Sequence, residues 1–240
     1  MLNLYPVPID AIAWCIGATV LWIFTLKCYL NYRVTRNPLL PKYMMIASTL
    51  GASCLLFGLP SLLTHDNHTL FYTNYIGDVF VQICMMGQIW LAWFIGWKKF
   101  VPLWVVLVPT IVFSCVILFF EYHTSSVYWS SSPYVVVYND AKSILWMKSI
   151  LYILISWPLG YFFIRLGLAQ QSRLARIKSI MTGLMFIFIS GAAIYTNLFN
   201  HGSDNFNSAV QNFIVFSVFL LITIWPRKRQ AALANQPTLH

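Results

Sequence analysis

The chain alternates between long apolar runs and short polar segments, and each apolar run is about as long as one membrane crossing. A helix of about 20 mainly apolar residues is long enough to cross the hydrocarbon of a bilayer. The pattern therefore predicts one membrane domain over residues 1–229, followed by a short tail over 230–240. Its seven predicted transmembrane helices cover residues 11–29, 43–63, 75–97, 101–120, 144–168, 177–198 and 206–225.

The segment between the fourth and fifth predicted helices has a different pattern. Two short runs at 125–129 and 134–138 are rich in β-branched and aromatic residues, and a Ser-Pro break separates them. Such runs favour strands, so we expect a short β-hairpin here. No apolar run shows the alternation typical of an outer-membrane barrel strand. The predicted fold class is an all-α membrane protein, a seven-helix bundle with one small hairpin.

Composition supports a membrane protein. The 240 residues are 59% hydrophobic and only 9% charged, whereas about 25% of the residues in a soluble domain are charged. A net charge of +9 could indicate a nucleic-acid partner. The Lys and Arg residues, however, lie in short segments between apolar runs and do not form one soluble face. We expect a lipid bilayer around the chain and no nucleic acid.

The charges also predict an orientation. Most Lys and Arg residues follow the first, third, fifth and seventh predicted helices, whereas the six acidic residues lie at or near the opposite side. Lys and Arg are enriched in cytoplasmic loops of membrane proteins. The amino terminus and the hairpin are therefore predicted outside and the carboxyl terminus in the cytoplasm. The expected location is the cytoplasmic (inner) membrane of a bacterium.

Charged residues inside two predicted helices are the first candidates for a functional site. Asp78 lies within the third helix, where an ionisable group is costly and often functional. Gln82 is four residues further along the same helical face. Lys148 lies at a matching depth in the fifth helix. One interpretation is that Asp78 and Lys148 form an ion pair, and the other is that each side chain reaches the lipid headgroups separately.

Amide side chains of the sixth and seventh predicted helices lie at the same level. They could form an outward-facing polar cup for a small ligand, or they could hydrogen-bond to neighbouring helices. We expect the cup to be rimmed by aromatic residues. The predicted ligand-binding residues are Asp78, Gln82, Lys148, Asn197, Gln211, Asn212 and the rim residue Trp146.

The histidines suggest a metal site at the outer face, because imidazole and carboxylate groups suit transition metals. Their spacing matches no compact metal motif, and solvated or pH-responsive histidines are the alternatives. No predicted span contains a histidine, which argues against an intramembrane Ser-His enzyme. We expect no enzymatic activity and no cofactor. The candidate metal ligands are His65, His68, His123 and His201.

Several features follow one another in a recognisable order: Leu107-Val-Pro109-Thr in the fourth helix, Glu121-Tyr-His123 opening an outer loop, and a basic run before the sixth helix. The basic run comprises Arg173, Arg176 and Lys178, and it is followed by Gly183 and, near the outer end, by Asn197. This order resembles the seven-helix membrane sensing region of bacterial histidine kinases and diguanylate cyclases. The kinase or cyclase domain of that family has no counterpart here. The resemblance implies a sensor that signals through a separate protein partner.

Two other classes of protein remain open. A small-molecule transporter would show repeated halves with broken helices, and the first three and last three predicted helices show no such match. A subunit embedded in a larger complex would present a stripe of small residues to its partners. Residues 51–54, Gly183 and residues 191–193 could supply that stripe. The favoured prediction is a receptor-like or sensory protein that binds a small ligand at its outer face.

Overall fold

The computed structural model describes residues 8–131 and 134–199. In these ranges it contains six helices that are long and apolar enough to cross a membrane. The seventh predicted span, 206–225, and the tail lie outside the described residues. The helices are α1 (Ile9–Thr35), α2 (Leu40–Leu63), α3 (Asn67–Ala92, continued by the π-helix η1, Trp93–Trp97), α4 (Leu103–Thr124), α5 (Lys142–Leu168) and α6 (Arg173–Phe199).

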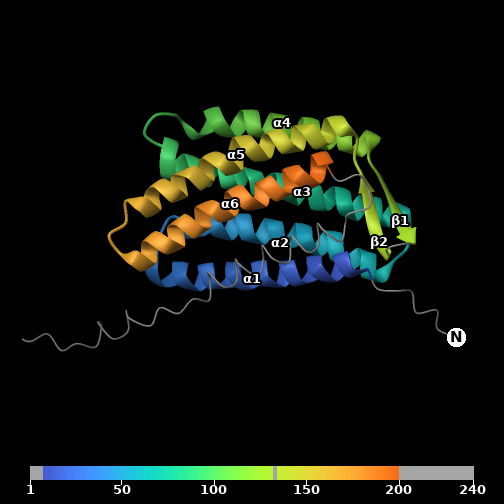
Figure 1. Cartoon of the computed structure of the whole chain (residues 1–240), viewed down its shortest axis with the longest axis horizontal. Coiled ribbons are helices and arrows are strands. Elements are labelled where there is room, and N and C mark those ends of the chain that lie inside the picture. Colours follow the sequence, from blue (N-terminus) through green and yellow to red (C-terminus); the bar gives the residue numbers. More distant parts are fainter. Residues whose placement is uncertain (1–7, 132–133, 200–240) are drawn as a thin grey trace, which may run out of the picture.

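Helix α3 organises the bundle. It packs against α2, α4 and α5, while α1 packs on α2 and α6 packs on α5 (Figure 1). Its buried positions include small and polar residues such as Gly77, Asp78 and Gln88 as well as apolar ones. The polar side chains of Asn74, Asp78, Gln82 and Gln88 on the central helix are therefore enclosed by the bundle.

The start of α3 differs from the sequence prediction. The helix begins at Asn67 and not at residue 75, because Asp66 caps it. The Asp66 carboxylate accepts hydrogen bonds from the Thr69 backbone N–H at 2.9 Å and from the Thr69 hydroxyl at 2.6 Å. Side-chain acceptors of this kind satisfy the free N–H groups of a first helical turn. The same bonds hold the pKa of Asp66 below its usual value.

Glycines allow α5 and α6 to approach closely. A Cβ atom added at Gly183 would lie 2.5 Å from the Gly160 carbonyl oxygen, so the two backbones are in contact at this point. On α2, a Cβ at Gly51 would collide with the Trp22 indole of α1, and Cys54 is fully buried. Gly51, Cys54 and Gly183, which the sequence suggested for a partner-binding stripe, are thus used for packing within the chain.

The predicted β-hairpin is present. Strands β1 (Ser126–Ser131) and β2 (Tyr134–Asn139) pair in antiparallel register, from Ser126 opposite Asn139 to Ser131 opposite Tyr134. Val127 and Val136 pack on Leu70 near the start of α3. The hairpin therefore covers one end of the bundle (Figure 1). We call this the hairpin end.

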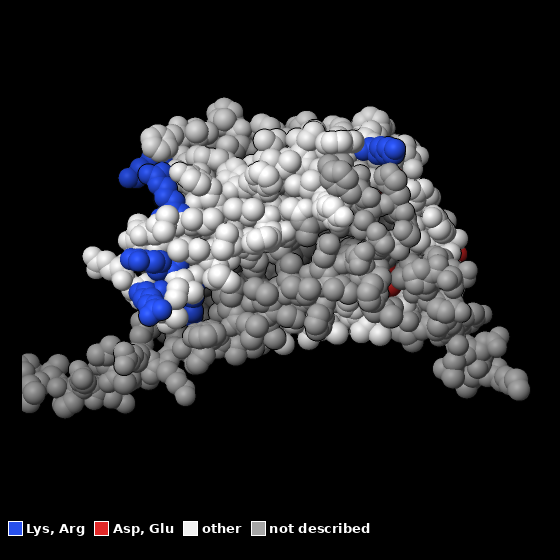
Figure 2. Space-filling view, viewed as in Figure 1, with Lys and Arg blue, Asp and Glu red and all other residues white. Residues whose placement is uncertain are grey.

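Lys and Arg residues gather at the opposite end, here called the basic end. In the view of Figure 2 the basic side chains cluster there, apart from one group at the hairpin end. Exposed bases of this end are Arg33, Arg36, Lys98, Lys99, Arg165, Arg173 and Arg176. The sorting of charge predicted from the sequence is thus visible in space. Which end faces the cytoplasm remains a prediction from the positive-inside rule.

Lys42 is an exception, because it is buried near the start of α2. Its ammonium lies 4.1 Å from the Phe94 ring centroid and 4.5 Å from that of Trp90. It also donates a hydrogen bond to the Pro38 carbonyl at 2.8 Å. Cation–π contacts of this kind compensate part of the lost hydration and join α2 to the end of α3.

Candidate functional site

At the hairpin end, Lys148 of α5 lies at the centre of three carboxylates. Its Nζ atom is 2.8 Å from Asp140 Oδ2, 3.0 Å from Glu121 Oε1 and 3.3 Å from Asp78 Oδ2. Lys148 is only 6% exposed. The structure thus brings Asp78 and Lys148 together, as the ion-pair interpretation expected. We call Lys148, Asp78, Glu121 and Asp140 the ion cluster.

Each member of the ion cluster comes from a different element. Asp78 is on α3, Glu121 is near the end of α4, and Asp140 lies between β2 and α5. The Ser125 hydroxyl donates to Asp140 Oδ1 at 2.6 Å, and this bond closes the base of the hairpin. The cluster therefore joins three helices to the hairpin.

The surroundings of Asp140 favour its charged form. Burial raises the pKa of its carboxyl group, but the Lys148 ammonium and the hydrogen bonds from Lys148 and Ser125 outweigh burial. The net effect is a pKa below the ordinary value. Asp140 is therefore ionised at neutral pH and holds Lys148 in place.

Acidic groups outnumber basic groups in the ion cluster. Three carboxylates and one ammonium give a formal charge of −2, and Glu121 Oε2 is buried without a hydrogen-bond partner among the described residues. The Asp78 and Glu121 carboxylates both contact the same ammonium, that of Lys148. Buried charge without compensation is costly. The cluster therefore favours an additional proton or cation.

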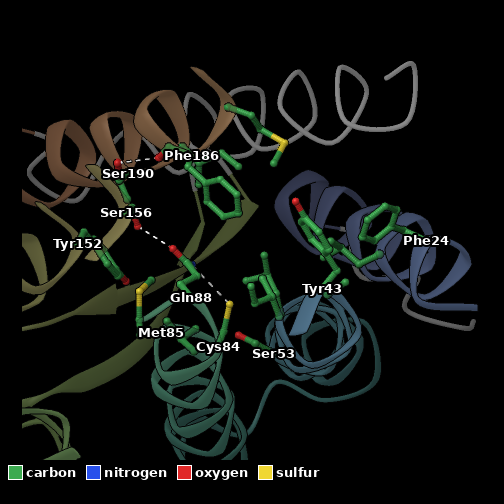
Figure 3. Close-up of a pocket in the computed structure, with 18 of the residues that line it drawn as sticks. Phe24, Tyr43, Ser53, Cys84, Met85, Gln88, Tyr152, Ser156, Phe186 and Ser190 are labelled. Atoms are coloured by element: carbon green, nitrogen blue, oxygen red, sulfur yellow. Dashed lines mark hydrogen bonds between the residues drawn. The ribbon is translucent and has the colours of Figure 1, made fainter. Parts of the chain in front are cut away.

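A cavity of about 220 Å³ lies between the helices (Figure 3). Asp78 is one of its lining residues. Its wall is formed by α1, α2, α3, α5 and α6, and Asp78 is the one charged residue among the described residues that line it. Most of the wall is apolar. The apolar lining residues are Trp14, Leu21, Phe24, Ile46, Ala47, Leu50, Phe57, Val81, Cys84, Met85, Met185, Phe186, Ile189 and Ala193, with Tyr43 and Tyr152 beside them.

A few polar side chains interrupt this wall. The Ser156 hydroxyl donates to Gln88 Oε1 at 2.8 Å, which joins α5 to α3 across the cavity (Figure 3). Ser190 donates to the Phe186 carbonyl of its own helix at 2.8 Å. The Ser53 hydroxyl is fully buried and has no hydrogen-bond partner in the described part of the chain. An unpaired buried hydroxyl is costly, so a bound molecule with a polar group would be stabilised there.

Of the other predicted ligand-binding residues, the structure describes the side chains of Gln82 and Trp146, and neither lines the cavity. Gln82 is buried, but it does not line the cavity, and its amide has no hydrogen-bond partner among the described residues. Trp146 is 56% exposed, because it lies about 200° around α5 from Lys148. The Asn197 side chain, Gln211 and Asn212 lie outside the described residues. In the described ranges, Asp78 and Lys148 are enclosed under the hairpin, and no open cup surrounds them.

The outer histidines make aromatic contacts. His65 stacks on Trp129 with ring centroids 4.2 Å apart, and His68 packs edge-on against Tyr72 at 4.7 Å. His123 packs against Phe119, and His201 lies outside the described residues. Within residues 8–131 and 134–199, no three His, Cys, Asp or Glu residues are arranged to hold a metal ion. The structure lends no support to a metal site in this part of the chain.

Sequence reasoning missed two members of the ion cluster and the whole cavity. Glu121 and Asp140 flank the hairpin in the sequence. Two acidic residues at these positions were the sequence feature that could have indicated further partners for Lys148. The cavity has no sequence signal, because it depends on how side chains of five helices pack. Compared with protein-family models and with curated proteins, the chain matches none of them. The geometry of the cavity and the ion cluster is therefore the basis for a functional proposal.

Proposed function

We propose that this membrane protein is receptor-like and binds a small, mainly apolar molecule between its helices. The cavity that reaches Asp78 supports this proposal most directly. A cavity of about 150 Å³ holds a benzene molecule of six heavy atoms, so about 220 Å³ accommodates roughly nine. An apolar wall with a few convergent polar groups is the usual form of a small-molecule site.

The position of the cavity fits a sensory role better than a catalytic one. Asp78 lines the cavity and also contacts Lys148, which in turn contacts Asp140 at the base of the hairpin. A ligand that engages Asp78 would act on α3, the helix that packs against α2, α4 and α5. Small shifts of packed helices are a common form of switching. The signal would pass to a separate protein partner, as the resemblance to bacterial sensing regions implies.

Filling the cavity tests this function. Ala47 is 2% exposed and lines the cavity, so Ala47→Phe places a ring in the binding space. Ala52 lies on the same helix and does not line the cavity, so Ala52→Phe is the matched control. The probes are octylamine, 1-octanol and octanoate, which all carry an eight-carbon chain. Binding to the full chain in lipid nanodiscs is measured by native mass spectrometry, with empty nanodiscs as the blank.

We expect at least one probe to bind the wild-type chain with one-to-one stoichiometry. Ala47→Phe should weaken that binding at least tenfold, because the ring and the probe compete for the same volume. Ala52→Phe should change it less than twofold. Equal binding to the wild-type and Ala47→Phe chains, or no binding of any probe, would overturn the proposed function.

A further inference from the structure

We propose that the ligand is a cationic amphiphile, an amine on an apolar body, whose ammonium group binds the Asp78 carboxylate. This inference rests on the proposed function and names the chemical class of its ligand. It follows from one residue that has two roles, because Asp78 lines the apolar cavity and also belongs to the ion cluster.

The charge of the ion cluster favours a cation. With all four side chains ionised, the formal charge is −2, and each carboxylate already shares the same ammonium. An amine ligand would reduce this excess by one. A carboxylate ligand would add a further negative charge beside Asp78, and an alcohol would leave the excess unchanged.

The distances favour Asp78 as the carboxylate that can leave Lys148 for a ligand. Its contact with Lys148 is the longest of the three, at 3.3 Å, against 3.0 Å for Glu121 and 2.8 Å for Asp140. If Asp78 turns to a ligand, Lys148 keeps two carboxylate partners and stays compensated. If Glu121 or Asp140 turned away from Lys148 instead, a contact shorter than that of Asp78 would be lost. Asp78 is therefore the carboxylate that can exchange partners.

The shape of the cavity supports an elongated apolar body. Asp78 and Gln88 both line it and are ten residues apart on α3, which is about 15 Å along the helix axis. Between them the wall on α3 is formed by Val81, Cys84 and Met85. An amine held at Asp78 would thus extend its apolar part along α3 toward Gln88. The Ser53 hydroxyl, which has no hydrogen-bond partner in the described part of the chain, offers a place for a second polar atom.

The test compares the three eight-carbon probes on the wild-type chain and on two variants. Asp78→Asn removes the carboxylate from the cavity. Asp66→Asn makes the same chemical change at the hairpin end, but on an exposed helix cap outside the cavity. Affinities are measured in nanodiscs of zwitterionic lipid, so that amines are not concentrated by anionic headgroups. Empty nanodiscs and the Ala47→Phe chain report the remaining partition into lipid.

We expect the wild-type chain to bind octylamine at least tenfold more tightly than 1-octanol, with octanoate weakest. In Asp78→Asn the amine and the alcohol should bind within about twofold of each other. Asp66→Asn should keep the wild-type preference. If Asp78→Asn does not fold, Asp78→Glu retains the negative charge and should keep the preference for the amine.

The outcomes separate this inference from the proposed function. Equal affinities of octylamine and 1-octanol for the wild-type chain, both lost in Ala47→Phe, would overturn the cationic ligand and leave the binding cavity standing. A preference for octylamine that survives in Asp78→Asn would also overturn it. Failure of all three probes to bind the wild-type chain would overturn both.

Discussion

At the residue scale, Lys148 is the side chain on which the hairpin end depends. It compensates three carboxylates that come from different elements. Replacing one partner of a buried ion pair costs about 3–5 kcal/mol, because the remaining charges lose their compensation. We therefore expect Lys148→Met to destabilise the folded chain by about that amount, measured by denaturant unfolding in detergent.

The matched control is Lys142→Met at the start of the same helix. Lys142 is exposed, and exposed surface charges contribute about 0–1 kcal/mol. Equal losses of stability in the two variants would contradict a special role for Lys148.

Asp140 gives a prediction for pH. Its pKa in the folded chain is lowered from the ordinary value of 3.8, because Lys148 and Ser125 stabilise its charged form against the effect of burial. Its stabilising contribution is therefore complete above pH 3.8 and is lost as pH falls through the lower pKa of the folded state. Unfolding curves across this range should show wild type losing stability relative to Asp140→Asn as the solution is acidified. A stability difference that does not change with pH would contradict this assignment.

The contact between Asp78 and Lys148 could be predicted because both charges lie at the same depth in apolar segments. An ion pair there lowers the free-energy cost of burying each charge. The other two carboxylates could not, because their approach depends on how the hairpin returns the chain to the start of α5. Gln82 was expected in the site from its four-residue spacing. The structure buries it near Asp78 but outside the cavity wall.

At the element scale, the contact between α5 and α6 is limited by glycine. Gly183 leaves no room for a Cβ atom, since the Gly160 carbonyl oxygen would be 2.5 Å away. Alanine favours a helix over glycine by about 1 kcal/mol, but here the helices would have to separate. We expect Gly183→Ala to lower the free energy of unfolding by about 1–3 kcal/mol, the usual cost of overpacking.

Gly191 on the same helix is the control, because an added Cβ there meets nothing within 4 Å among the described residues. Gly191→Ala should be neutral or stabilising by up to about 1 kcal/mol. If both alanine variants have the same free energy of unfolding, the close backbone contact at Gly183 does not limit stability.

Elements were the most predictable level of this structure. Backbone groups in lipid must be hydrogen-bonded within the segment, so a long apolar run forms a helix almost regardless of its detailed sequence. The β-branched runs of the hairpin were equally informative. The early start of α3 was missed because polar residues such as Asn67, Thr73 and Asn74 are mixed with apolar ones in its first two turns, and the cap at Asp66 was not recognised. The cavity could not be predicted, since it is defined by side-chain packing.

At the scale of the whole molecule, orientation is open to a direct test. We expect a cysteine introduced by His68→Cys to react with a membrane-impermeant maleimide in right-side-out vesicles. A cysteine introduced by Lys99→Cys should react in inside-out vesicles, because the basic end is predicted to face the cytoplasm. Labelling of the unsubstituted chain, which has five cysteines of its own, gives the background. The reverse pattern would show that the hairpin faces the cytoplasm.

The bond between Ser125 and Asp140 has a consequence for communication across the protein. Through Asp140 and Lys148 it connects the hairpin, which lies at one end of the bundle, to the carboxylate at the wall of the cavity. Free-energy coupling between two binding events is reciprocal. An antibody fragment that binds the hairpin and changes the conformation of its base would therefore change the affinity of the cavity for its ligand. Binding of the ligand in the cavity would change the affinity of the antibody fragment for the hairpin by the same factor.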